Sequence, residues 1–178
     1  MLHYEQISTA IKLPIIVQDY PEQTNVFMDS TLIKTLSKKV DRINNLKLED
    51  PPTPPKITAI RDIVTNDFGI FGGLGGTFLY EELMRGACGT MTGFSYPEVL
   101  VSIYNNVLSG ASEKARGIFH HYLPIIRYEH QSGIGIAIRK AILKKRGVLG
   151  NATPRLPQVE LDETTQKELY NLLDSLDL

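Results

Sequence analysis

Short apolar segments alternate with helical segments along the first half of the chain. Four segments are rich in apolar and β-branched residues, and each is closed by a turn or loop signal, so they predict buried β-strands. These segments cover residues 14–18, 42–48, 68–72 and 89–93. The segments between them have the spacing of helices and cover residues 30–40, 56–64 and 77–85. Thr77 is the expected N-cap of the last of these helices, and Gly86 is its expected stop.

This alternation predicts a parallel sheet. Successive strands begin about 20 to 30 residues apart, which is the length of one strand–helix unit, and such units connect parallel strands by right-handed helical crossovers. Strand signals cease after Gly93, and the rest of the chain has only helical spacing, with Pro97 in a first turn and Gly110 and Gly147 at helix ends. The helices expected there cover residues 97–108, 112–130, 134–146 and 162–176.

Pro51-Pro52-Thr53-Pro54-Pro55 is the only low-complexity stretch. Such a sequence is compatible with a polyproline ligand for a recognition domain. Its position between a predicted strand and a predicted helix favours a stiff connecting loop instead.

Composition and charge narrow the classes of partner. The 178 residues are 42% hydrophobic and carry a formal charge of -1, and the 19 basic residues are scattered, so nucleic acid is not expected as a partner. No apolar run approaches the length of a membrane span. The single cysteine, Cys88, excludes an internal disulfide, and the residues after Met1 lack the basic and apolar regions of a signal peptide. We therefore expect a cytoplasmic protein that does not bind membranes.

Lys47 is the main candidate for covalent chemistry. It shares a strand face with Asn45 and lies between the apolar Leu46 and Leu48, close to the carboxyl end of the second predicted strand. In a barrel of parallel strands, this end carries the active site. An amine that is partly removed from water gives up its proton more readily, and the free amine can attack a 2-keto acid to form a protonated imine. On the local sequence alone, a solvated lysine at a strand end is the simpler interpretation.

Four sequence motifs and their spacing resemble those of one enzyme family. In chain order they are Ile15-Ile16-Val17-Gln18-Asp19-Tyr20-Pro21, Leu46-Lys47-Leu48-Glu49-Asp50, Phe71-Gly72-Gly73-Leu74-Gly75-Gly76 and Gly86-Ala87-Cys88-Gly89-Thr90-Met91-Thr92-Gly93. They resemble the fifth to eighth strands of the (β/α)8 barrel of the dihydrodipicolinate synthase / N-acetylneuraminate lyase family. The opening His3-Tyr4-Glu5-Gln6-Ile7 looks like the helix before the fifth strand, so the resemblance covers the whole chain.

The resemblance implies an α/β fold, namely half of a (β/α)8 TIM barrel followed by a helical extension. Residues 1–108 would form the C-terminal half of the barrel, and residues 109–178 would form the extension packed on it. The first half of the barrel, where the family carries a threonine pair that binds the keto-acid carboxylate, has no counterpart in this sequence. Four strands alone leave two unpaired edges and an open apolar face. We therefore expect poor stability in isolation. Either the chain is a fragment of a longer protein, or a separate N-terminal half-barrel is its partner, or copies associate as a homo-oligomer.

The resemblance assigns two catalytic positions and one that binds the substrate. Lys47 takes the position of the Schiff-base lysine, Gln18 that of a proton-relaying tyrosine, and Gln23 that of an arginine that holds a substrate carboxylate. Glutamine cannot ionise as tyrosine does, and it lacks the charged fork of arginine. Both departures argue against dihydrodipicolinate synthase activity itself. Tyr20 and Tyr96 are the alternatives for the missing phenol, although either is more simply a wall residue.

The same resemblance places further residues around the substrate. Gly73 or Leu74 would contact the keto-acid end of the imine, and Thr90 and Met91 would line the same pocket. The glycine-rich run that includes Gly73 matches neither a phosphate loop nor a dinucleotide fingerprint. No cofactor and no metal ion are implied.

Glu49 and Asp50 follow the second strand as adjacent carboxylates. Adjacent residues at a strand end seldom converge, so we expect them to be loop charges and not an acid–base pair.

Two functions follow as hypotheses. The first is a Schiff-base-forming aldolase or hydro-lyase that uses Lys47 on pyruvate or a related 2-keto acid, and the glutamines at positions 18 and 23 favour a hydratase-aldolase or a sugar-acid lyase. The second is a catalytically silent relative that acts as a structural or binding subunit. The absence of half a barrel favours the second for the isolated chain.

Overall fold

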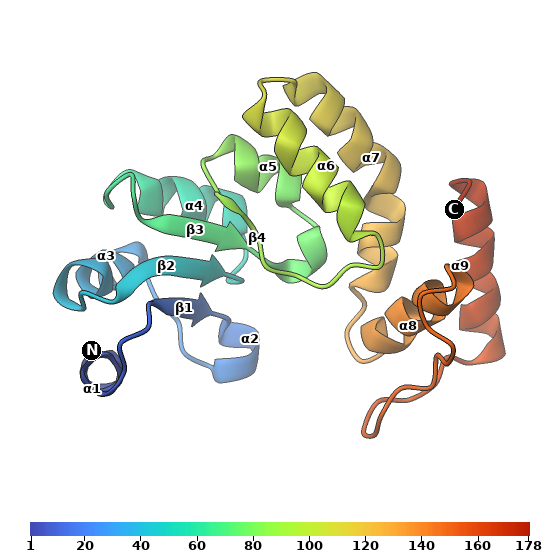
Figure 1. Cartoon of the computed structure of the whole chain (residues 1–178), viewed down its shortest axis with the longest axis horizontal. Coiled ribbons are helices and arrows are strands. Elements are labelled where there is room, and N and C mark those ends of the chain that lie inside the picture. The colour runs from blue at the N-terminus through green and yellow to red at the C-terminus, as the bar shows by residue number, and fades with distance from the viewer. The chain divides into compact units, whose positions relative to one another are not determined.

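The structure, a computed structural model, describes residues 1–178, which form two compact units. The first unit consists of Met1–Leu74 and Phe78–Met91, and the second consists of Gly75–Thr77 and Thr92–Leu178. Figure 1 shows the order of the helices and strands along the chain. No helix is both long enough and apolar enough to cross a membrane.

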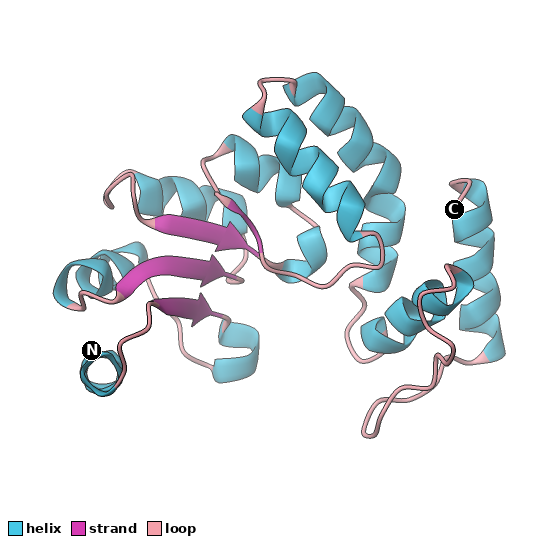
Figure 2. Ribbon diagram, viewed as in Figure 1, coloured by secondary structure: helices cyan, strands magenta, loops and turns pink.

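The first unit is built on a sheet of four parallel strands, which confirms the predicted α/β class. The strands lie side by side in chain order (Figure 2) and are β1 (Ile15–Asp19), β2 (Ile43–Leu48), β3 (Gly69–Gly72) and β4 (Gly89–Thr90). Each overlaps the segment predicted from its apolar residues. The fourth strand is shorter than predicted, because it ends at Thr90 and residues 91–93 continue without strand pairing.

Helices cover one face of this sheet. α3 (Ser30–Lys39) and α4 (Thr53–Arg61) contribute apolar residues to a core that they share with the strands. Asp29 begins α3, where its Oδ1 accepts a hydrogen bond of 2.7 Å from the N–H of Leu32. The core members from the strands are Val17, Ile43, Leu46, Leu48 and Ile70, and those from the two helices are Ile33, Leu36, Ile57 and Ile60. The remaining helices of the unit are α1 (Leu2–Ala10), α2 (Pro21–Thr24), the 3-10 turn η1 (Leu74–Gly76), which continues into the second unit, and α5 (Leu79–Met84).

The other face of the sheet is open in this chain. Gln18 pairs with Lys47 and Lys47 pairs with Phe71, so these three side chains form a row across three strands. Gln18 is exposed, and Ile16 on the same face of β1 is 46% exposed. Parallel sheets are normally covered on both faces. On this face of the sheet, both apolar and polar side chains are therefore exposed, and no second layer of structure covers them.

Two predicted details of the helices are wrong. α4 begins at Thr53 and not at residue 56, so the second half of the proline-rich stretch forms the first turn of the helix, with Pro52 as N-cap. Proline is tolerated there because the first N–H groups of a helix have no partner within it. α5 begins at Leu79 with Phe78 as its N-cap, so Thr77 does not cap it.

The second unit is helical, as predicted. Its helices are α6 (Pro97–Leu108), α7 (Ser112–Glu129), α8 (Gly135–Lys145) and α9 (Glu163–Ser175), and every end lies within one residue of its predicted position. Pro97 occupies the first turn of α6, and Gly110 and Gly147 have φ values of 79° and 72°, which suit residues just beyond a helix end. Ile103, Phe119, Ile126, Ile138 and Leu173 are buried in its core.

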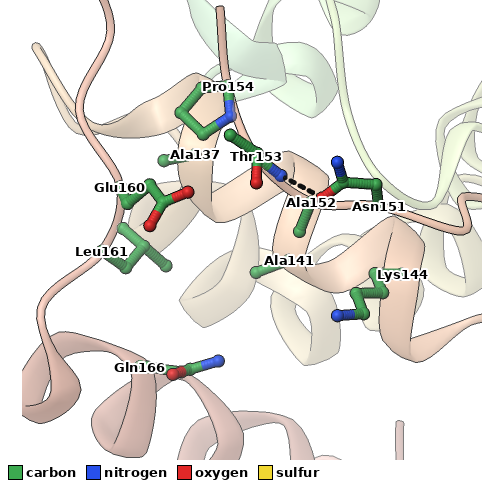
Figure 3. Close-up of a pocket in the computed structure, with 10 residues that line it drawn as sticks. All are labelled: Ala137, Ala141, Lys144, Asn151, Ala152, Thr153, Pro154, Glu160, Leu161 and Gln166. Carbon is green, nitrogen blue, oxygen red and sulfur yellow. Dashed lines mark hydrogen bonds between the residues drawn. The ribbon is translucent and has the colours of Figure 1, made fainter.

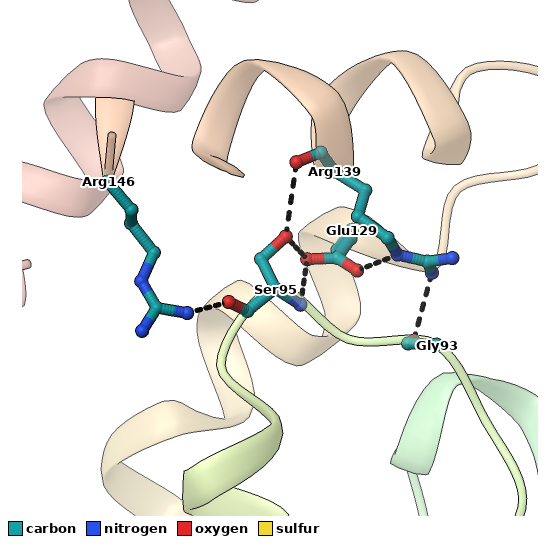
Figure 4. A network of polar contacts seen from close by, with 5 residues as sticks. All are labelled: Gly93, Ser95, Glu129, Arg139 and Arg146. Atoms are coloured by element: carbon teal, nitrogen blue, oxygen red, sulfur yellow. Dashed lines mark hydrogen bonds and ion pairs between the residues drawn. The ribbon is translucent and has the colours of Figure 1, made fainter. Parts of the chain in front are cut away.

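A buried carboxylate ties the segment before α6 to α7 and α8 (Figure 4). Oε2 of Glu129 accepts hydrogen bonds from the N–H of Ser95 at 3.0 Å and from its hydroxyl at 2.5 Å. Oε1 pairs with Nε of Arg139 at 2.5 Å, and the same guanidinium donates to the carbonyl of Gly93 at 2.9 Å. Arg146 donates to the carbonyl of Ser95. Because both carboxylate oxygens have partners, this buried charge is satisfied, and its role is structural.

Candidate active site

Lys47 lies one residue before the carboxyl end of β2, on the open face of the sheet. Its neighbours Leu46 and Leu48 are fully buried on the opposite face, so the alternation of the strand directs the lysine side chain away from the core. The Lys47 side chain is 22% exposed, and its Nζ lies 2.9 Å from Oε2 of Glu49. Lys47 is therefore a partly covered amine with a carboxylate in contact, and not a freely solvated one.

Glu49 is buried, which corrects the expectation that it is a loop charge. It is 7% exposed, and its N–H continues the strand pairing by donating to the carbonyl of Asp19 at 2.8 Å. Oε2 accepts a hydrogen bond of 2.5 Å from Nε2 of Gln18, and Oε1 accepts a long one of 3.5 Å from the N–H of Leu74. A Cβ on Gly73 would lie 2.4 Å from Cγ of Glu49, so the glycine leaves the space that this side chain occupies.

These contacts define what we call the Lys47 cluster, formed by Gln18, Lys47, Glu49, Gly73 and Leu74. Its members come from the carboxyl ends of three neighbouring parallel strands, where such sheets bind ligands. Four of them were predicted as site residues, and Glu49 was not. A signal was present in the sequence, because residues two apart in an extended segment point to the same side.

The other predicted site residues lie around this cluster in different environments. Gln23 lies in α2 and is exposed. Thr90 pairs with Gly72 and therefore lies one step beyond the row that contains Lys47. Its Oγ1 is buried and has no hydrogen-bond partner. Met91 follows β4, and its N–H donates to the carbonyl of Gly72 at 3.0 Å.

Asp50 turns away from Glu49, as expected for adjacent residues at a strand end. Nζ of Lys56 lies 2.7 Å from its Oδ2 and 2.6 Å from Oδ2 of Asp19. Asp19 is fully buried, and burial raises the pKa of its carboxyl, although the contact with Lys56 acts in the opposite direction. These three side chains form an ion-pair group that is separate from the Lys47–Glu49 pair.

The two tyrosines considered as substitutes for a phenol have unfavourable acidities. Burial raises the pKa of the Tyr20 hydroxyl, and the charges of Glu22 and Glu49 raise it further. Burial also raises the pKa of Tyr96, which belongs to the second unit. A phenol that loses its proton less readily is a poorer proton donor, and less of it is present as phenolate near neutral pH.

A second acid that sequence reasoning missed is Glu82 on α5. It is fully buried, and its Oε1 accepts a hydrogen bond of 2.6 Å from the hydroxyl of Thr53 at the start of α4. Its Oε2 is buried without a hydrogen-bond partner. Burial raises the pKa of Glu82 to about 7, which makes it a carboxyl that is neutral over much of the acidic range.

The second unit contains an open pocket of about 260 Å³ beside α8 and the segment that leads to α9 (Figure 3). Lys144 and Glu160 are its charged lining residues, and the N–H of Thr153 donates to Oδ1 of Asn151 at 2.9 Å within it. Nothing in this lining resembles a nucleophile paired with a base. In the whole chain, no group of three or more His, Cys, Asp or Glu side chains is placed to hold a metal ion.

Comparisons with known proteins agree over nearly the whole chain. The model of the Dihydrodipicolinate synthetase family matches residues 1–176. The L-2-keto-3-deoxyarabonate dehydratase of Azospirillum brasilense is 27% identical over 175 residues, which cover 98% of this chain and 56% of that protein. The 4-hydroxy-tetrahydrodipicolinate synthase of Archaeoglobus fulgidus is 27% identical over 180 residues, which cover 99% of this chain and 60% of that protein.

Among solved structures, the dihydrodipicolinate synthase from Rhodopseudomonas palustris is similar, with a TM-score of 0.90 and 37% sequence identity. The match covers 97% of this chain and 60% of that chain. This chain therefore spans 56 to 60% of the length of the relatives that it matches.

Proposed function

The chain belongs to the dihydrodipicolinate synthetase family, and from that premise we propose that Lys47 forms an imine with pyruvate or a related 2-keto acid. The observation that carries this proposal is the place of Lys47, a partly covered amine at the carboxyl end of a central parallel strand with a carboxylate 2.9 Å away. The protonated imine would draw electrons from the neighbouring carbon and so permit an aldolase or dehydratase reaction.

The four strands would be the fifth to eighth of a (β/α)8 barrel, with residues 1–108 as the barrel half and residues 109–178 as a helical extension. The parallel order β1-β2-β3-β4 and the single helix-covered face are what half of such a barrel would have. The open face would then be the inner wall of the barrel, and the Lys47 cluster would lie at its catalytic end.

The open face also motivates a proposal about partners. We expect four further strands to cover it, supplied by the rest of a longer protein, by a separate half-barrel, or by a second copy of this chain. Ile16 on this face is 46% exposed. At the edge strand β1, a mainly apolar cavity of about 380 Å³ is lined by Gln18, Met28 and residues of α1 and α3. Exposed apolar surface of this kind favours association.

The substrate would be a small 2-keto acid and not the pair of substrates used by a dihydrodipicolinate synthase. Gln18 and Gln23 lack the ionisable phenol and the guanidinium expected at these positions. The dehydratase named for the Azospirillum brasilense relative acts on a keto-deoxy sugar acid, and this class of substrate suits a site that needs an imine and an acid–base group but no arginine clamp. Thr90, Met91, Gly73 and Leu74 would line the substrate.

A catalytically silent subunit is the second candidate. It is favoured by the same two glutamines, since a protein released from catalysis has no need of the tyrosine or the arginine. The proline-rich stretch no longer supports this candidate as a partner ligand, because Thr53 is fully buried and begins α4.

The test is borohydride trapping with pyruvate. The chain is incubated with pyruvate, reduced, digested, and mapped by mass spectrometry, and we expect a pyruvate-derived mass on the peptide that contains Lys47. The variant Lys47→Met should lose this adduct, whereas Lys39→Met, which changes an exposed lysine on α3, should keep it. Absence of the adduct in a chain whose circular dichroism shows the expected helices would reject the imine enzyme and leave the silent subunit.

A further inference from the structure

The Lys47 cluster has a carboxylate beside Gln18, the position at which the resemblance calls for a proton relay. Oε2 of Glu49 lies 2.9 Å from Nζ of Lys47 and 2.5 Å from Nε2 of Gln18. The amide of Gln18 can donate to a carboxylate but cannot itself take a proton. Gln18, at the relay position, therefore donates its hydrogen bond to Glu49, the acid that contacts the amine of Lys47.

We propose that Glu49 is the general base and general acid of imine formation at Lys47. The proposal rests on the proposed function of Lys47 and adds a catalytic residue that the family resemblance does not assign. Three features support it: Glu49 is within hydrogen-bond reach of the reacting nitrogen, it is 7% exposed, and the missing side chain of Gly73 leaves it room. A general base must first meet this geometric requirement.

The proton transfers balance around one carboxylate. Glu49 takes a proton from the Lys47 ammonium, and the free amine attacks the keto carbon, so that an N–C bond forms and the carbonyl π electrons move to oxygen. The acid form of Glu49 then protonates this oxygen, and its carboxylate takes one proton from the new C–N⁺H2 group. A second protonation of the hydroxyl by Glu49 releases water as the nitrogen lone pair forms the C=N⁺ bond. The net change is ammonium plus ketone to protonated imine plus water, and Glu49 ends as a carboxylate.

The other acids of the first unit that are not exposed have partners elsewhere. Asp19 and Asp50 pair with Lys56, and Glu82 is hydrogen-bonded to Thr53. Glu49 is the carboxylate that contacts Lys47. The assignment therefore does not depend on choosing among several acids at equal distance.

The experiment compares two reactions of the same amine. Trapping with pyruvate and cyanoborohydride requires proton transfer to the carbonyl oxygen, whereas acetylation by acetic anhydride requires only a free amine. Both rates are measured at the Lys47 peptide by mass spectrometry in the full chain. Because acid–base groups contribute about a hundredfold or more, we expect Glu49→Gln to slow trapping about a hundredfold without slowing acetylation. Glu81→Gln, the same change at an exposed site on α5, should alter neither rate.

The outcomes distinguish the proposed role of Glu49 from the proposed imine formation at Lys47. If the unaltered chain gives no adduct at Lys47, the proposed function fails and the role of Glu49 fails with it. If the unaltered chain is trapped and Glu49→Gln is trapped within twofold of the same rate, only the role of Glu49 is overturned. A parallel loss of trapping and acetylation would also overturn it, because Glu49 would then act only on structure.

A second variant covers the case in which Glu49→Gln does not fold. Glu49→Asp keeps the charge but withdraws the carboxylate by one methylene, and we expect it to be trapped about tenfold more slowly than the unaltered chain, again without slower acetylation. Trapping of this variant at the original rate would overturn the proposal.

Discussion

Replacing Glu82 by glutamine should remove a pH dependence from the stability of the first unit. Glu82 is fully buried, its Oε1 is bonded to the hydroxyl of Thr53, and its Oε2 has no hydrogen-bond partner. Burial raises its pKa from 4.5 to about 7, against the smaller opposing effect of the Thr53 hydrogen bond. Glutamine has the same shape and an oxygen that can accept this hydrogen bond, but it carries no charge at any pH.

The magnitude follows from the difference in acidity between the folded and unfolded chain. A raised carboxyl pKa means that the folded state holds the proton more tightly, so the stabilising effect is present in full below pH 4.5 and is lost as the pH rises through about 7. A difference of about 2.5 units corresponds to about 3 kcal/mol. We therefore expect Glu82→Gln to match the unaltered chain, within a few tenths of a kcal/mol, at pH 4, and to exceed its free energy of unfolding by about 3 kcal/mol at pH 8.

The assay is urea denaturation followed by circular dichroism at half-unit steps between pH 4 and pH 8. Glu81→Gln changes the neighbouring exposed carboxyl and should leave the pH profile within about 0.5 kcal/mol of the original. A constant difference between Glu82→Gln and the unaltered chain across this range would refute the reasoning, because it would show that the substitution acts through packing and not through ionisation.

Two further substitutions around the sheet, with a glycine control in α7, are tested by denaturation. Lys56→Met removes the ion-pair partner of fully buried Asp19, whose Oδ1 already lacks a hydrogen bond. It should lower the free energy of unfolding by about 3 to 5 kcal/mol at pH 7, with partial recovery in acid as the aspartate takes up a proton. Equal losses at pH 4 and pH 7 would contradict this account. Gly72→Ala would place a Cβ 1.8 Å from Oε2 of Glu82 and should lower the free energy of unfolding by about 1 to 3 kcal/mol. Gly117→Ala, in the middle of α7 with nothing within 4 Å of the added Cβ, should instead raise it by up to about 1 kcal/mol. The opposite order of the two variants would count against the packing argument.

The elements that local sequence specifies were predicted well. The helices of the second unit have strong apolar periodicity and clear end signals, such as Pro97 and the glycines at positions 110 and 147, and their ends were found to within one residue. The strands were also found, because each is a short apolar run between turn signals. The start of α4 was missed because prolines argue against a helix interior but are acceptable in its first turn.

Only the site residues that lie in motifs resembling the family were predicted from the sequence. Lys47 and Gln18 were located by resemblance, and the pairing of β1 with β2 places them side by side. The burial of Glu49 depends on Gly73 and on Gln18, which are distant in sequence and approach it only through the sheet. Glu82 is likewise buried by tertiary packing, and nothing in the local sequence of α5 distinguishes it from exposed Glu81.

Gly72 and Gly73 each make room for an acid, and the two acids have different partners. A Cβ on Gly72 would collide with the carboxyl of Glu82, and a Cβ on Gly73 would collide with that of Glu49. Glu82 has no cationic partner, so it folds most easily in its neutral form. Oε2 of Glu49 lies 2.9 Å from the amine of Lys47, so this acid has a cationic partner at the proposed reaction centre. The negative charge of Glu49 is one of the smaller causes that raise the pKa of Glu82. A neutral Glu82 therefore adds no further negative charge beside the Lys47–Glu49 ion pair.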